Sequence, residues 1–122
     1  MGKGDEAILE CAFFIPVRRD AHLSDGKKHK PILWKWLDSE LYRQFEGGSQ
    51  ASGLYRGFYK DPDTGERVED ESRRFLLAVP QSRLIELRSF ISGLCLLFQQ
   101  KAIYLSIGGI VEFIEAPPHE QE

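Results

Sequence analysis

The chain is poor in the features that mark several specialised classes of protein. Only two of its 122 residues are cysteine, without a CxxC or Cys-His spacing, which excludes a disulfide-rich scaffold and a spaced zinc motif. Asparagine is absent, so the chain contains no N-glycosylation sequon. No apolar run approaches the roughly 20 residues that cross a bilayer, and we expect no membrane-spanning helix.

A strong excess of one charge is also missing. The 16 basic and 19 acidic residues give a net charge of −3, so no overall positive field attracts nucleic acid, and we expect no such partner. Residues 1–6 lack the cationic and apolar segments of a secretory signal, and we therefore expect a cytoplasmic protein. The length predicts one domain over residues 1–122, with an ordered core at 7–115 and tails at 1–6 and 116–122.

What is present is an ordered change of hydrophobic period. Residues 7–15 alternate as a strand does, and residues 33–45 repeat apolar side chains every four positions as a helix does. A polar-turned hairpin at 54–79, a helix at 84–98 and an alternating run at 102–115 follow. The order β-α-β-β-α-β predicts an α+β, ferredoxin-like sandwich: a four-stranded antiparallel sheet with two helices on one face.

Two details of this fold are predicted from local chemistry. The turn sequence Asp61-Pro62-Asp63-Thr64-Gly65 closes the hairpin, in which we expect residues 54–59 to pair with 74–79. Cys11 and Cys95 fall in phase with apolar neighbours, so we expect buried free thiols and no bound metal. The core is expected to include the inner stripes of the two helices, namely Leu37, Leu41, Leu87, Ile91 and Leu94.

The last alternating run is too long for a straight strand. Its residues would extend about 46 Å, whereas a compact chain of this length is about 35 Å across. Gly108 and Gly109 therefore mark a bulge, a hairpin turn, or the start of a strand that pairs with another chain. Apolar side chains continue beyond these glycines, and the uncovered sheet face is expected to carry several aromatic residues. Both observations favour a homodimer.

One polar loop, residues 17–30, holds most of the candidate site residues. His22 and His29 are catalytic candidates, together with Tyr104 from the last run, because a loop over the end of a sheet can place acid–base groups. Arg18 and Arg19 are candidate ligand-binding residues for an anion. The same residues also fit an exposed polar loop without chemistry, and no cofactor motif accompanies them.

Three further motifs are incomplete. The turn resembles a calcium loop only at its start, because its sixth and twelfth positions are Glu66 and Ser72 rather than glycine and glutamate. The sequence Arg56-Gly57-Phe58-Tyr59 matches only the opening of the RNA-binding signature. The charged cluster Asp70, Glu71, Arg73 and Arg74 fits either surface ion pairs or an acid–base pair.

Several segments also carry a family resemblance. They are Phe13-Phe14-Ile15-Pro16, the tryptophan-bearing helix 34–45 with Gly47-Gly48, the hairpin from Tyr55-Arg56-Gly57 to Asp70-Glu71-Ser72, and Phe98-Gln99-Gln100-Lys101 before Ile103-Tyr104-Leu105. In these residues the chain resembles a family of small uncharacterised bacterial proteins with a ferredoxin-like α+β fold. The resemblance covers residues 9–115 and implies that fold, with no activity or site to carry over.

Two classes of function fit the sequence. The first is an interaction or assembly module that acts as a homodimer and has no chemistry of its own. The alternative is a small dimeric α+β enzyme or small-molecule binder with a site near residues 17–30. A pocket with convergent polar groups near His22 or His29 would favour the alternative.

Overall fold

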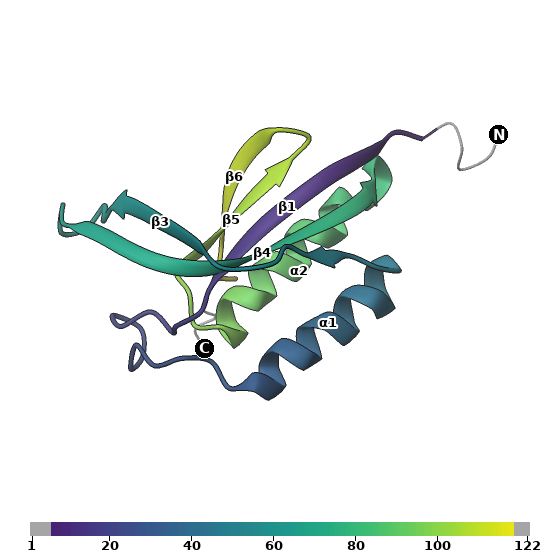
Figure 1. The fold of residues 1–122 in the computed structure, drawn as a ribbon. Helices are drawn as coiled ribbons and strands as arrows, with labels where there is room; N and C mark the ends of the chain where they lie inside the picture. The colour runs from purple at the N-terminus through teal and green to yellow at the C-terminus, as the bar shows by residue number, and fades with distance from the viewer. Residues whose placement is uncertain (1–5, 119–122) are drawn as a thin grey trace.

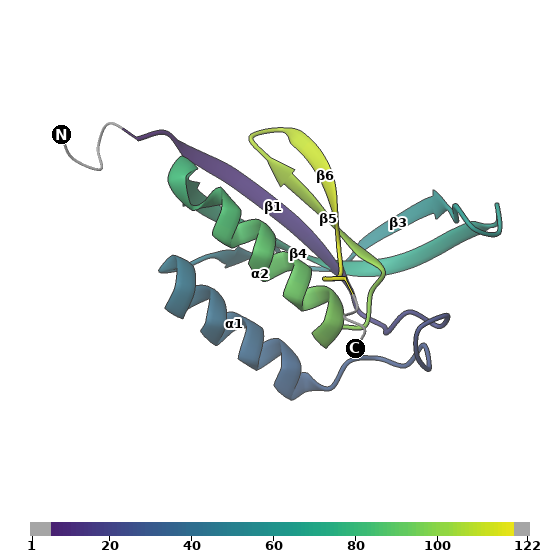
Figure 2. The same ribbon diagram turned by 180° about the vertical axis from the view of Figure 1, so that it is seen from behind.

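Two helices lie on the same side of a six-stranded antiparallel sheet in the computed structural model, which describes residues 6–118 (Figures 1 and 2). The expected tails at 1–6 and 116–122 therefore fall largely outside the described residues. The elements in chain order are β1 (Ile8–Pro16), α1 (Pro31–Phe45), β2 (Ser49–Gln50), β3 (Tyr55–Lys60), β4 (Arg67–Pro80), the 3₁₀ turn η2 (Gln81–Arg83), α2 (Leu84–Leu97), β5 (Ala102–Ile107) and β6 (Ile110–Glu115).

The four-stranded ferredoxin-like sandwich expected from the sequence is wrong. The strands lie in the order β2-β4-β1-β5-β6, and β3 pairs with β4 beside β2. Two events raise the strand number to six. The chain forms a short edge strand, β2, directly after α1, and the last alternating run folds into two strands rather than one. Short edge pairing of this kind leaves almost no hydrophobic pattern in a sequence.

The β3–β4 ribbon pairs in a different register from the one expected. Tyr55 lies opposite Ser72 and Lys60 opposite Arg67, so β3 pairs with the first half of β4 and not with residues 74–79. The second half of β4 pairs with β1, from Ser72 opposite Pro16 onward. The acidic residues in the first half of β4 do not interrupt it, because the ribbon projects from the sheet and both of its faces can hold charged side chains there (Figure 1).

Gly108 and Gly109 form the hairpin turn between β5 and β6. Their φ angles are +56° and +91°, and a two-residue hairpin turn of the primed type needs positive φ at both positions. Because the run turns back on itself, the overhang that argued for pairing with a second chain does not exist. The homodimer then rests on the uncovered sheet face alone and stays a prediction.

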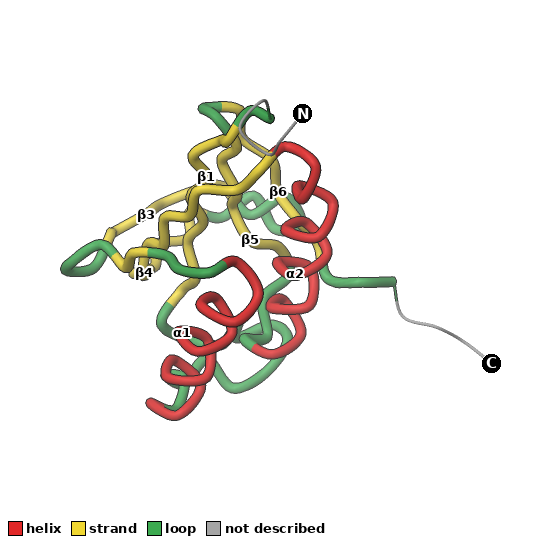
Figure 3. The backbone as a smooth tube through the Cα atoms, turned by 90° about the vertical axis from the view of Figure 1, so that its right-hand side faces the viewer, coloured by secondary structure: helices red, strands yellow, loops and turns green. Residues whose placement is uncertain are grey.

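The core lies between the sheet and the two helices, the layers that Figure 3 shows from the side as yellow and red tubes. β1 contributes Cys11, Phe13 and Ile15, which are fully buried. The helix stripes predicted from the sequence are confirmed, since the following residues are all at most 4% exposed: Leu37, Leu41, Leu87, Ile91 and Leu94. Cys11 and Cys95 are buried free thiols, as predicted. No helix within residues 6–118 has the length and apolar character needed to cross a membrane.

Candidate functional site

The loop at residues 17–30 is held tightly against the end of β1. Arg18 and Lys28 form an isolated antiparallel bridge, and the Arg19 and His29 amides donate hydrogen bonds to the carbonyls of Lys27 and Val17. The guanidinium of Arg19 also donates to both carboxylate oxygens of Asp25, at 2.8 and 3.1 Å. Arg19 is therefore already paired inside its own loop, which removes it as a free anion-binding residue.

His29 lies in the core rather than at a surface site. Its side chain is 5% exposed and packs edge-on against the rings of Trp34 and Phe98, with centroids 5.5 and 4.9 Å away. Its Nε2 donates to the Pro16 carbonyl at 2.9 Å, since a carbonyl can only accept. Its Nδ1 has no hydrogen-bond partner among residues 6–118. The arrangement fastens the loop to the core and leaves no approach for a substrate.

His29 is expected to make stability depend on pH. Burial lowers its pKa, and the charges of Arg19 and Arg73 lower it further, against the opposite effect of the Pro16 hydrogen bond. Below about pH 6.5 the unfolded chain takes up a proton that the folded chain refuses, so the free energy of unfolding falls, by at most about 1.4 kcal/mol per pH unit. Urea unfolding at pH 7.5 and 5.5 measures this loss. His29→Gln should reduce it, whereas His22→Gln, in the exposed part of the loop, should not.

The sequence-predicted candidates do not form one site. His22 is exposed on the loop, and its backbone amide donates to Asp20. Tyr104 lies on one face of the sheet, with Phe14, and His29 lies on the side of the other face. Arg18 is exposed, and only its backbone is fixed, by the bridge to Lys28 and by a hydrogen bond from Gln100. The third histidine, His119, lies outside the described residues. The expected site near residues 17–30 is not assembled.

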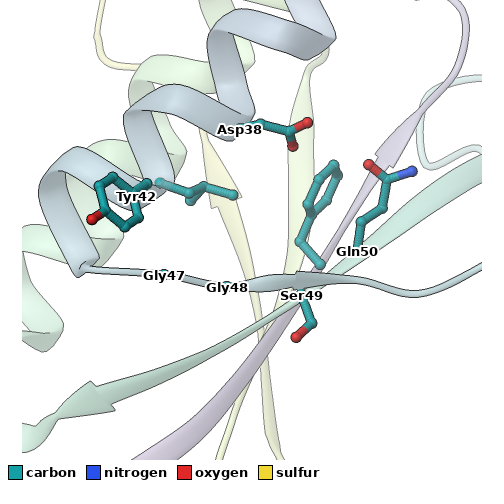
Figure 4. Close-up of a pocket in the computed structure, with 8 residues that line it drawn as sticks. Asp38, Tyr42, Gly47, Gly48, Ser49 and Gln50 are labelled. Atoms are coloured by element: carbon teal, nitrogen blue, oxygen red, sulfur yellow. The ribbon is translucent and has the colours of Figure 1, made fainter.

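Two hollows lie at the edges of the helix layer. One, of about 290 Å³, separates the end of α1 from β2, with Asp38 and Tyr42 on the helix and Ser49 and Gln50 on the strand (Figure 4). Among the residues that the structure describes, Asp38 is the only charged side chain that lines it. The other, of about 470 Å³, lies at the end of α2 and includes Cys95. Burial raises the pKa of that thiol to about 11, so it is not a nucleophile at neutral pH. Within the described part of the chain, neither hollow brings catalytic groups together.

The face of the sheet that the helices leave uncovered, here called the open face, carries a row of aromatic rings. Because side chains alternate along a strand, Phe14 points away from the buried Phe13 and onto this face. Its ring meets Tyr55 of β3 at 5.5 Å and Tyr104 of β5 at 5.2 Å, and Tyr104 meets Phe113 of β6 at 5.8 Å. All three contacts are edge-to-face, and Tyr55 and Phe113 are 40% and 68% exposed. This aromatic row, Phe14, Tyr55, Tyr104 and Phe113, offers accessible ring faces.

Two oppositely charged side chains flank Tyr55 on the same face. Tyr55 lies opposite Ser72, so Asp70 and Arg74 occupy its two diagonal positions on β4, about 7–8 Å away. The Arg74 guanidinium carbon is 5.9 Å from the centre of the Tyr55 ring and 6.0 Å from that of Phe14. Within residues 6–118, Arg74 forms no ion pair. Its guanidinium can therefore donate hydrogen bonds to the carboxylate or phosphate of a ligand.

Asp70 is a half-buried carboxylate without a compensating partner. In the part of the chain that the structure describes, it has neither a hydrogen bond nor an ion pair, and burial raises its pKa. Gly57 lies directly opposite it on β3. A Cβ atom at Gly57 would stand 3.5 Å from the Asp70 Oδ1, so the glycine leaves the space beside the carboxylate open. A desolvated, unpaired carboxylate is a common mark of a functional site.

The open face brings together side chains that the sequence analysis treated separately. Tyr104, a catalytic candidate from the sequence, lies among the aromatic rings of this face, away from the loop. The sequence grouped Asp70 and Arg74 with Glu71 and Arg73 in one charged cluster. The strand divides this cluster between two faces, since Glu71 and Arg73 point to the other face. The signal that could have located the site is the alternation along β4, had residues 67–80 been taken as one strand.

The fold is shared with known enzymes of solved structure, while no family model and no curated protein sequence matches the chain. One is a phage SAM lyase in complex with S-methyl-5'-thioadenosine, with a TM-score of 0.68 and 15% sequence identity over 94% of this chain and 95% of that chain. A phage SAM lyase in the apo state gives a TM-score of 0.64 and 18% identity over 92% of each chain. The likeness shows a common fold, and the comparisons give no support to an assembly module without chemistry.

Proposed function

We propose that this chain is a small enzyme that binds S-adenosylmethionine on the open face and cleaves the bond between its sulfonium sulfur and its amino-acid side chain. The observation that carries the proposal is the likeness, over nearly the whole length of both chains, to a phage SAM lyase in complex with S-methyl-5'-thioadenosine. Because fold alone does not determine function, the groups on the open face must also fit the substrate.

The open face offers a partner for each part of this substrate. Adenine stacks on aromatic rings, and the aromatic row supplies them from four strands. A sulfonium cation is attracted to the negative face of an aromatic ring and to a carboxylate, which Tyr55 and Asp70 provide on neighbouring positions. The carboxylate of the amino-acid end suits the unpaired guanidinium of Arg74.

The proposed reaction balances without an external reagent. As the carbon–sulfur bond breaks, its electron pair stays on sulfur, and the sulfonium becomes the neutral thioether S-methyl-5'-thioadenosine. The four-carbon fragment then either closes through its own carboxylate, which forms a new carbon–oxygen bond and a lactone, or loses a proton from the adjacent carbon to give an alkene. The lactone and the alkene are isomers that chromatography separates.

The test is to incubate the purified chain with S-adenosylmethionine and to quantify both adenosyl compounds by chromatography. We expect one S-methyl-5'-thioadenosine for each substrate consumed, at a rate well above an enzyme-free sample that measures spontaneous breakdown. Arg74→Gln should raise KM about 10- to 100-fold, because a hydrogen bond to a charged group contributes about 1.5–3 kcal/mol. Arg56→Gln is the matched control, since Arg56 is exposed on the other face of β3.

Two results would contradict the proposal. One is a folded protein, verified by circular dichroism, that consumes no S-adenosylmethionine beyond the enzyme-free rate. The other is an equal rise of KM in Arg74→Gln and Arg56→Gln, which would remove the open face from the binding site.

A further inference from the structure

We infer that Asp70 makes the open-face site selective for charge, so that it binds the cationic sulfonium of the substrate tightly and the neutral thioether of the product weakly. The inference rests on the proposed function and names a specificity-determining residue within it. It also explains how a site built for S-adenosylmethionine can release S-methyl-5'-thioadenosine, which keeps the same adenosyl group.

The position of Asp70 leaves its carboxylate available to a ligand beside Tyr55. Both residues lie on the open face as diagonal neighbours across the β3–β4 pairing, a spacing that one bound group can bridge. Gly57 opposite Asp70 has no side chain to occupy the intervening space. A sulfonium held over the ring of Tyr55 is therefore within reach of the Asp70 carboxylate.

Among residues 6–118, no cation forms an ion pair with Asp70. The ammonium of Lys101, whose charge acts on neighbouring Tyr59, already pairs with Asp63, at 3.3 Å. The phenol of Tyr59 lies close enough for the charge of Asp70 to help raise its pKa, behind the larger effect of burial, but a phenol carries no positive charge. Arg74 lies at the other diagonal of Tyr55, with Ser72 between it and Asp70 on β4. The missing positive charge is one that a ligand can supply.

The balance of free energies changes when the bond is cleaved. A desolvated carboxylate without a partner is costly to the folded protein, and a bound sulfonium offsets that cost. The sulfonium is also attracted to the ring face of Tyr55. Both attractions require the positive charge on sulfur, and both are lost when sulfur becomes a neutral thioether.

The experiment compares a cationic and a neutral ligand that the enzyme cannot cleave in the proposed way. Sinefungin replaces the sulfonium sulfur and its methyl group by a carbon that carries an ammonium group, so its positive charge lies beside the sulfonium position, whereas the sulfur of S-adenosylhomocysteine is neutral. Isothermal titration calorimetry on the full chain at pH 7.5 should give a Kd for sinefungin at least 10-fold lower than that for S-adenosylhomocysteine. Asp70→Asn should reduce this preference to less than about threefold. Glu69→Gln should retain it, because Glu69 lies on the other face of the ribbon and pairs with Arg56 and Arg67.

A second readout separates a binding role from a structural one. Because burial raises the pKa of Asp70, the folded state disfavours its charged form, and stability is lost as pH rises through that pKa. Asp70→Asn removes this cost, so its thermal midpoint at pH 7.5 should equal or exceed that of the unsubstituted chain. A midpoint lower by several degrees would show that the fold needs the carboxylate and would overturn the inference.

The remaining outcomes are distinguishable. If the unsubstituted chain binds both ligands with the same Kd, or if Asp70→Asn keeps the preference for sinefungin, the inference is wrong and the proposed function stands. If the unsubstituted chain binds neither ligand nor S-methyl-5'-thioadenosine, the proposed function fails and the inference fails with it.

Discussion

Tyr55→Ala is expected to lower kcat/KM for S-adenosylmethionine cleavage about 100-fold, equivalent to about 2.7 kcal/mol. The substitution removes the ring that stands between Asp70 and Arg74 and meets Phe14 edge-on at 5.5 Å. Attraction of a cation to a ring face contributes about 0.5–2 kcal/mol, and the edge-to-face contact with Phe14 that is lost with the ring contributes about 0.5–1.5 kcal/mol. The measurement is the initial rate of S-methyl-5'-thioadenosine formation over a range of substrate concentrations.

Two variants define what Tyr55 contributes. Tyr55→Phe keeps the ring and should retain most of the activity, because stacking and attraction of a cation need no hydroxyl group. Phe58→Ala is the matched control: it removes a ring that is 68% exposed on the same strand, but Phe58 faces the other side of the ribbon, beneath Arg67. Activity of Tyr55→Ala within twofold of the unsubstituted chain would remove Tyr55 from the site.

Ile91→Ala is expected to lower the free energy of unfolding by about 2–5 kcal/mol. Ile91 is completely buried on the inner stripe of α2, so truncation leaves a cavity against the sheet as well as a loss of apolar burial. A domain of this size has a total stability of about 5–15 kcal/mol, and the variant therefore loses a large share of it. Urea unfolding followed by circular dichroism gives the difference directly.

Ile85→Ala serves as the control on the same helix. Ile85 makes the identical chemical change but is 78% exposed, so the cost should stay within about 0.5 kcal/mol. Equal losses in the two variants would mean that the face of α2 assigned to the core is wrong.

The helices could be predicted because their signal is local. Leu37 and Leu41 recur one helical turn apart, and Ile91 and Leu94 do the same in the second helix, so each stripe reveals its buried face. The turn at the tip of the β3–β4 ribbon could also be predicted from the sequence, since Asp61 accepts hydrogen bonds from two backbone amides within its own turn. These elements needed no information about distant residues.

The candidate site could be predicted only in fragments. The alternation along each strand placed Phe14 and Tyr104 on the face that points away from their buried neighbours. The sequence could not show that the two rings would touch. The polar composition of residues 17–30 suggested a catalytic loop that includes His29. In the structure the His29 ring is instead enclosed by Trp34 and Phe98. A histidine's role depends on what surrounds it in space. The three groups around His29 come from other segments of the chain: the Pro16 carbonyl from β1, Trp34 from α1 and Phe98 from the end of α2.

The sequence by itself determined where the two helices lie, which of their faces are buried, and that both cysteines are apolar core residues. Only the tertiary structure decided that Gly108 and Gly109 reverse the chain, that the sheet has six strands, and that Asp70, Tyr55 and Arg74 meet on one face. The reason is physical. Periodicity reflects contacts between residues two to four positions apart, whereas strands pair through backbone groups that every residue carries, so the chain does not mark which distant strand will be its neighbour.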